Sequence, residues 1–375
     1  MALYHFAILF LQTFLLSAIL TPAMRKIALG LGFMDQPGER KVHHVPKPLL
    51  GGAAIFLSLM TVVFVDWFAL QWLASWVRGN GGWISREIAS LADYAAGARS
   101  VRGQMLGLVL GGLVVFVVGL YDDRCGVHPC MKLASQILAG IILYFADIRI
   151  TLLIPSELWS FCVTVFWVVL VTNAYNLLDN MDGLSGGVAV ISLLVLAVAT
   201  HWLGAQFFIT SYLVASIGAI SGFLLYNFHP SSIFMGDAGS MFIGYNLAAM
   251  STLATFLSSS DQAWSTWAII MPVVIMAVPL FDTGSVIIIR LKNHKPIYVG
   301  DKNHFSHRLV SLGMSQRNAV LTIYLVTLCT GLGALVLPYV DTVGAFVILL
   351  QTIAIFCVIA LLEHVKSNNA SNGAS

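Results

Sequence analysis

Apolar residues occur along the chain in long blocks separated by short polar segments. We count eleven blocks, at about 2–22, 48–68, 103–120, 132–147, 158–172, 187–203, 207–226, 241–258, 265–288, 318–337 and 343–362. Crossing the hydrocarbon core of a membrane takes roughly 20 apolar residues in a helix. Backbone polar groups find no water partners in lipid, so such segments must be helical. The pattern therefore predicts an all-α, polytopic integral membrane protein with about eleven transmembrane helices.

The blocks predict one transmembrane domain over residues 1–362 and a disordered cytoplasmic tail over 363–375. Because the first block lacks a charged start and a cleavage site, we interpret it as a retained span. Residues 71–102 form an external insertion between the second and third blocks. An amphipathic helix on the outer surface is expected there, because apolar residues recur at helical spacing. These residues are Ile84, Ile88, Leu91 and Ala95.

Composition and charge fit this picture and orient the chain. Hydrophobic residues make up 58% of the chain and charged residues 10%, which excludes a soluble domain. With the N-terminus outside, fourteen of the nineteen Lys and Arg residues fall on one face. The positive-inside rule makes that face cytoplasmic, together with the C-terminus. The net charge of +2 thus reflects membrane orientation, and we expect no nucleic-acid partner. The five cysteines have no paired spacing and are interpreted as structural.

The stretch "NAYNLLDNMDGLSGG" is the main concentration of polar residues between two apolar blocks. Asn176, Asp179 and Asp182 are spaced three residues apart, so they share one face if the helix continues through them. Ionisable residues this close to hydrocarbon tend to mark a ligand pathway or a catalytic site. The alternative is a solvated loop whose acids cap the next helix.

Two further acidic motifs fall on the same face. "YDDR" places Asp122 and Asp123 side by side, and adjacent side chains on a helix diverge by about 100°. "MGDAGS" places Asp237 among small residues, where a bulky anion can approach. A charged loop start and a capped helix start would give the same two patterns.

Five carboxylates converging with few basic partners would repel one another, and a divalent cation is the simplest way to stabilise them. All-oxygen ligands favour Mg²⁺, with Mn²⁺ as the alternative. His304, His307 and Arg308 resemble a phosphate-binding cluster more than a metal site, although ordinary positive-inside charge is an alternative. Together these groups suit phosphoryl transfer between a soluble nucleotide and a lipid.

Six motifs in order carry a family resemblance over nearly the whole chain. They are "RKVHHVPKPLLGG", "YDDR", "NAYNLLDNMDGLSGG", "FMGDAGS", "PLFDT" and "HFSHRL". The chain resembles the polyprenyl-phosphate N-acetylhexosamine-1-phosphate transferases. That family includes the bacterial GlcNAc-1-phosphate transferases and, more distantly, the phospho-MurNAc-pentapeptide translocase.

The resemblance implies a UDP-N-acetylhexosamine donor, most simply UDP-GlcNAc, and undecaprenyl or another polyprenyl phosphate as acceptor. UMP would leave in a Mg²⁺-assisted reaction at the cytoplasmic face of the bacterial inner membrane. This would be the first membrane step of a cell-envelope polysaccharide pathway. Whether the protein forms a homodimer is left open.

The resemblance also implies residue roles. Asp122, Asp123 and Asp179 would be catalytic, and Asp237 with Asp123 would bind the metal. The substrate-binding residues would be Asn176, Asp182, His304, His307, Arg308 and, in the first cytoplasmic loop, Arg40, Lys41 and His43. The chain departs from the family pattern at Ser306 and Arg308, where histidine is common, and at Asn180, where glycine is frequent.

Alternative functions remain open at this point. Within the enzyme class, the rival is transfer of phospho-MurNAc-pentapeptide, although the lone "HFSH" favours a simpler sugar. A secondary transporter also has polar residues near broken helices, and a non-catalytic scaffold is a third possibility. For the enzyme, we favour direct attack by the lipid phosphate, positioned or deprotonated by Asp122, over a phospho-aspartate intermediate.

Overall fold

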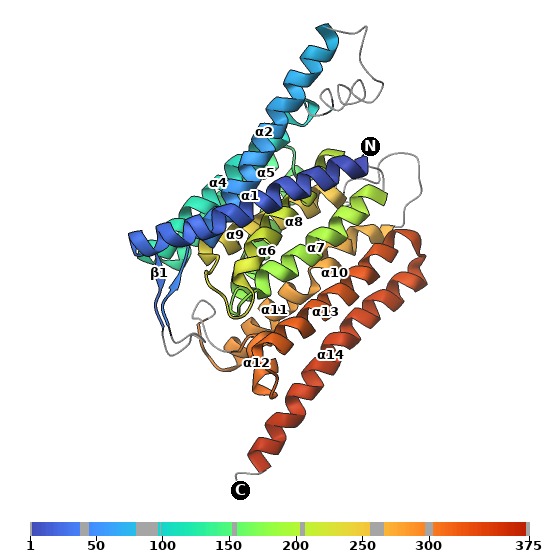
Figure 1. The fold of residues 1–375 in the computed structure, drawn as a ribbon. Coiled ribbons are helices and arrows are strands. Elements are labelled where there is room, and N and C mark those ends of the chain that lie inside the picture. The colour runs from blue at the N-terminus through green and yellow to red at the C-terminus, as the bar shows by residue number, and fades with distance from the viewer. Residues whose placement is uncertain are drawn as a thin grey trace.

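Helices make up nearly all the regular structure in the computed structural model (Figure 1). The structure describes residues 2–37, 45–79, 97, 99–151, 156–202, 207–255, 266–296 and 303–372. The longer helices are α1 (Ala2–Leu31), α2 (Gly51–Gly79), α4 (Arg102–Cys125), α5 (Pro129–Phe145), α6 (Glu157–Leu178), α7 (Leu184–Trp202), α8 (Phe207–Asn227), α9 (Gly236–Thr255), α11 (Ala277–Lys292), α13 (Gln316–Val336) and α14 (Thr342–Asn372).

Short elements complete the described chain. They are the 3₁₀ helices η1 (Thr266–Ile270) and η2 (Leu337–Tyr339), and the short α-helices α10 (Met271–Ile275) and α12 (Phe305–Ser311). The strands β1 (Met34–Asp35) and β2 (Lys47–Pro48) pair antiparallel between α1 and α2.

Every apolar block contains helix, which confirms an all-helical, polytopic integral membrane protein. In the described ranges, eight helices are long and apolar enough to cross a membrane, or nine if one bent pair counts as a span. The sequence pattern predicts about eleven. The difference arises from α5, which has only 17 residues, and from α9, whose 20 residues are not apolar enough to belong to this set.

The ninth apolar block is a broken helix, where the sequence pattern predicts one continuous span over 265–288. Segments Trp267–Ile275 and Ala277–Lys292 meet at 70°. Pro279 accounts for the position of the break, because a proline lacks an N–H and its ring clashes with the carbonyl four residues earlier. That carbonyl belongs to Ile275, the last residue of α10.

Helix α9 lies at the centre of the bundle and packs most extensively against α4 and α6. From Ala238 to Ala254, its side chains are buried. Glycines allow backbones to approach closely here: a Cβ on Gly52 would lie 2.2 Å from the Gly239 nitrogen, and one on Gly119 would lie 2.6 Å from Ala238. These contacts fix the N-terminal end of α9 against α2 and α4.

The ends of the chain and the insertion differ in part from the sequence expectations. Helix α2 extends to Gly79, so residues 71–79 prolong the second helix. The amphipathic helix expected around 84–95 lies outside the described residues. Helix α14 continues past residue 362 to Asn372, where the sequence pattern predicts a disordered tail, since a formed helix gains a hydrogen bond with each added residue. The two termini lie at opposite ends of the bundle (Figure 1).

We predict that Gly52→Ala will destabilise the protein by about 1–3 kcal/mol, the usual cost of overpacking a core. The three atoms nearest to the added methyl group would be backbone atoms of Gly239 and Met235, which cannot rotate away. Thermal unfolding of the purified protein in detergent measures the effect. The control is Gly103→Ala, because a Cβ at Gly103 has nothing within 4 Å. Equal melting temperatures for the two variants would contradict the prediction.

Candidate functional site

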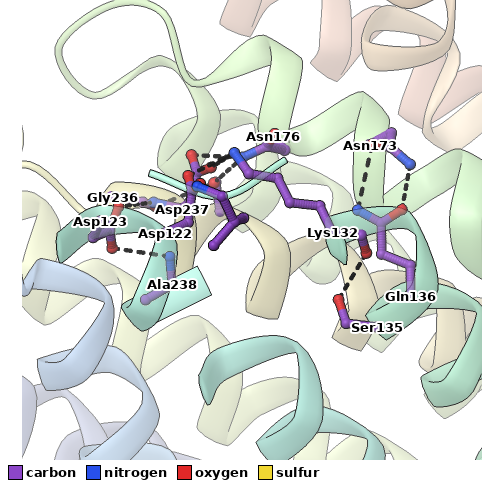
Figure 2. A network of polar contacts seen from close by, with 12 residues as sticks. Asp122, Asp123, Lys132, Ser135, Gln136, Asn173, Asn176, Gly236, Asp237 and Ala238 are labelled. Carbon is purple, nitrogen blue, oxygen red and sulfur yellow. Dashed lines mark hydrogen bonds and ion pairs between the residues drawn. The ribbon is translucent and has the colours of Figure 1, made fainter. Parts of the chain in front are cut away.

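Three helix ends meet at one end of the bundle and bring together most of the acidic motifs (Figure 2). Asp122 and Asp123 lie in the last turn of α4, Asn176 lies in the last turn of α6, and Asp237 is the second residue of α9. The structure thus joins residues that are more than a hundred positions apart in the sequence.

Asp123 holds the N-terminus of α9. Its Oδ1 accepts a hydrogen bond from the backbone N–H of Asp237 at 2.7 Å, and its Oδ2 accepts one from the N–H of Ala238 at 3.1 Å. The first N–H groups of a helix need outside acceptors, and a carboxylate there also suits the helix dipole. Gly236 permits this approach, because a Cβ would lie 2.4 Å from Asp123 Oδ2 and φ is +69°. Both oxygens of Asp123 are therefore engaged within the protein.

Lys132, from the first turn of α5, balances the other two acids. Its Nζ donates to Asp237 Oδ2 and lies 2.6 Å from Asp122 Oδ2. The second oxygen of Asp122 accepts from the N–H of Val127 at 2.7 Å. The sequence pattern does not predict this role, because there Lys132 is only one of the fourteen basic residues on the cytoplasmic face. The available signal was a lysine at the start of the helix that follows "YDDR".

Asn176 completes the cluster. Its Nδ2 donates to Asp237 Oδ1 at 3.0 Å and to Ser240 Oγ at 2.8 Å. Asp237 thus has an amide on one oxygen and an ammonium on the other (Figure 2). The hydrogen bond from Asn176 fixes the orientation of the Asp237 carboxylate. A cation that takes the place of the Lys132 ammonium would therefore find Oδ2 of Asp237 already oriented towards it.

Asp179 differs from its neighbours, since within the described ranges its carboxyl group makes no side-chain hydrogen bond. It is half-buried, directly after α6. Burial, and to a smaller extent the negative charges of Asp237, Asp182 and Asp35, raise the pKa of Asp179 to about 8. An ionised Asp179 therefore has no compensating partner among the described residues, and an incoming cation would stabilise it.

Asp182 links two loops through hydrogen bonds to both of its carboxylate oxygens. Its Oδ1 accepts from Ser231 Oγ at 2.8 Å, and its Oδ2 accepts from the N–H of Ser231 and contacts His229 Nδ1, both at 3.0 Å. These bonds tie the loop after α6 to the segment between α8 and α9. They engage the Asp182 oxygens within the chain, whereas the family resemblance implies a nucleotide-sugar contact.

The histidine motif lies against α11 and the loop after α6. His304 Nδ1 is 2.9 Å from Asp282 Oδ2, and the ring centroids of His304 and His307 are 6.4 Å apart. Arg308 Nη2 donates to Ser285 Oγ at 2.9 Å. Arg40, Lys41 and His43 lie outside the described residues, so the basic first loop stays a prediction from the sequence.

The arrangement can be compared with the needs of a metal ion. Among the described residues, no group of three or more His, Cys, Asp or Glu side chains is placed to hold an ion by itself. Asp122 and Asp237, however, already share one cationic group, and both offer oxygen. This donor set fits Mg²⁺, which takes one or two protein carboxylates and completes its shell with water and substrate phosphates.

Comparisons with known proteins find relatives among glycosyl 1-phosphate transferases. Residues 105–255 match the model of glycosyl transferase family 4. The chain is 33% identical to the probable undecaprenyl-phosphate N-acetylglucosaminyl 1-phosphate transferase of Bacillus subtilis, over 88% of this chain and 84% of that one. It is 33% identical to the decaprenyl-phosphate N-acetylglucosaminephosphotransferase of Mycobacterium tuberculosis, over 86% and 80%. A phospho-N-acetylmuramoyl-pentapeptide-transferase of Geobacillus thermodenitrificans is 28% identical over 66% and 73%.

The raised pKa of Asp179 predicts how stability depends on pH. Between the ordinary pKa of 3.8 and about 8, the folded protein keeps a proton that the unfolded chain has released. The free energy of unfolding should therefore fall as pH rises through this window in protein freed of metal by chelator. Melting temperatures at several pH values test this, and Asp179→Asn should flatten the profile. Indistinguishable profiles for the native protein and the variant would contradict it.

Proposed function

The chain belongs to the family of polyprenyl-phosphate N-acetylhexosamine-1-phosphate transferases, and on that premise we propose that it transfers GlcNAc 1-phosphate from UDP-GlcNAc to undecaprenyl or another polyprenyl phosphate, releasing UMP. The observation that supports it most directly is the cluster of Asp122, Lys132 and Asp237 at the ends of apolar helices. A lipid acceptor reaches that level from the membrane, and a nucleotide sugar reaches it from water.

The choice of sugar follows the relatives. Two that are 33% identical over most of their length are named for N-acetylglucosamine, whereas the pentapeptide transferase is 28% identical over a shorter stretch. The positive-inside count supports a site that faces the cytoplasm of a bacterial inner membrane. Because the chain belongs to a transferase family, we do not retain the hypotheses of a secondary transporter or a non-catalytic scaffold.

The reaction we propose is a single displacement. An oxygen of the lipid phosphate bonds to the β-phosphorus of UDP-GlcNAc, and the bond from that phosphorus to the oxygen bridging the two phosphates breaks. The electron pair leaves with UMP. Because the second pKa of a phosphate monoester is about 6, the lipid phosphate is already largely dianionic at neutral pH. Its difficulty is the approach to another anion.

Each residue of the cluster has its own role in the proposed transfer. Asp237 and Asp122 would hold Mg²⁺, with Asp122 in place of the Asp123 expected from the sequence, because both Asp123 oxygens accept hydrogen bonds from α9. The ion would neutralise charge on the pyrophosphate and the leaving UMP. Lys132 is then free to donate to phosphate oxygens, since its ammonium carries three donors. Asp123 keeps the start of α9 in place through the N–H groups of Asp237 and Ala238. Asn176 orients the Asp237 carboxylate.

We predict that purified protein with Mg²⁺ and undecaprenyl phosphate will release UMP from UDP-GlcNAc. Release should exceed that from UDP-GalNAc or UDP-MurNAc-pentapeptide, and lipid-linked GlcNAc pyrophosphate should form in equal amount. Asp237→Asn should lower kcat at least about a hundredfold, the usual loss when a charge-stabilising group is removed. Asp147→Asn changes an exposed carboxylate at the other end of the bundle and should keep full activity. Acceptor-independent UMP release, or none with any donor, would refute the proposal.

Lys132→Met should also lower kcat about a hundredfold, because methionine keeps most of the length and the unbranched apolar stem of lysine but donates no hydrogen bond to phosphate. The matched control is Lys26→Met, which removes an exposed lysine from α1. Initial rates over a range of UDP-GlcNAc concentrations separate kcat from KM. Native kcat in Lys132→Met would show that the ammonium takes no part in transfer.

A further inference from the structure

Asp282 fixes the start of the histidine motif. It lies on α11, is fully buried at 0% exposure, and uses both oxygens: Oδ2 is 2.9 Å from His304 Nδ1, and Oδ1 accepts from the N–H of Phe305 at 2.6 Å. A carboxylate oxygen can only accept, so Nδ1 of His304 must donate. The Nε2 atom is thereby left as the ring nitrogen that faces away from Asp282.

A second contact joins the histidine motif to the acids. Ser306, which is 1% exposed, donates from Oγ to Oδ1 of Asn180 at 2.5 Å. The Nδ2 of Asn180 donates to the carbonyl of Leu177 in the last turn of α6, at 3.0 Å. Asn180 directly follows Asp179, so α12 is bonded to the loop that carries Asp179, the acid for which the described residues provide no hydrogen-bond partner.

Ser306 and Asn180 are also two of the positions where the sequence departs from the family motifs. Histidine is common at the first and glycine is frequent at the second. A glycine has no side chain to accept the hydroxyl proton of Ser306. In this chain, the residues at these two positions are the two partners of one hydrogen bond.

We propose that Asp282 and the Ser306–Asn180 pair form one positioning bridge, which sets the distance between His304 and Asp179. On the proposed function, this distance decides where the phosphates of the donor lie relative to the acids. None of the three residues needs to touch the substrate. Asp282 acts through His304, and the Ser306–Asn180 pair acts through the backbone that carries Asp179.

The first test compares two variants of Asp282. Asp282→Asn keeps an oxygen for the N–H of Phe305 but turns an amide donor towards His304 Nδ1, whereas Asp282→Ala removes both acceptors. Thr283→Val is the matched control on α11, because the Thr283 hydroxyl is buried and has no hydrogen-bond partner in the described chain. Asp282→Asn should raise KM for UDP-GlcNAc about tenfold, the equivalent of one lost charge-assisted hydrogen bond. Its melting temperature should stay near that of the control. A melting temperature as low as that of Asp282→Ala, with native KM, would overturn the proposal.

The second test is a double-mutant cycle of Ser306→Ala and Asn180→Ala. Each single change should raise KM about three- to tenfold, the range for one neutral hydrogen bond. The double variant should be no worse than Asn180→Ala alone, because both changes remove the same contact. Additive effects would overturn the bridge.

The four proteins of this cycle are the native protein, the two single variants and the double variant. They also show whether a failure lies with the bridge or with the proposed function. If the native protein turns over no UDP-GlcNAc, the proposed function fails while the bridge can still be judged. The shifts in melting temperature should then be non-additive across the cycle. Additive shifts would reject the bridge whatever the activity of the native protein.

Discussion

Several carboxylates can lie together beside hydrocarbon only if each negative charge meets a fixed donor, because an uncompensated charge in a poorly solvated place is costly. The structure meets this constraint with three kinds of donor. Backbone N–H groups of α9 serve Asp123, the ammonium of Lys132 serves Asp122 and Asp237, and loop groups serve Asp182. Asp179 is the exception among the described residues: burial and the neighbouring negative charges raise its pKa, and no described donor offsets them. The carboxyl group of Asp179 is therefore the place in the cluster where a bound cation would be stabilised most.

The packing of the bundle makes this balance possible. The N–H groups that serve Asp123 belong to α9, whose start is held by backbone contacts at Gly52 and Gly119. Side chains at these glycines would push α9 away from α2 and α4, and the donors would move with it. The small residues of "LLGG" and "MGDAGS" are thus connected to the chemistry through the position of one helix end.

The sequence predicts the helical segments well, because apolar blocks of this length have no other stable conformation in a membrane. It also identifies the polar motifs. It does not predict how the acids divide their roles: in the sequence Asp123, Asp179 and Asp182 have similar surroundings, and only tertiary hydrogen bonds separate the two engaged acids from the one without a partner. Lys132 was missed for the same reason, since its role depends on where α5 lies relative to α9. Pro279 is a local signal for the broken helix. The apolar residues continue on both sides of it, however, so the pattern predicts one unbroken span.

These contacts also bear on whether an aspartate attacks the donor first. Covalent catalysis needs an ionised nucleophile with an oxygen free to attack. Asp122 has one oxygen on the N–H of Val127 and the other on Lys132, and Asp123 is engaged on both sides. Asp179 has the freedom, but a pKa of about 8 keeps it mostly protonated at neutral pH until a cation arrives. Once a cation is present, the same attraction that ionises Asp179 also holds its oxygen and weakens its attack. The lipid phosphate is already largely dianionic at neutral pH and its oxygens are free to attack, so the charge arrangement of this site favours direct displacement.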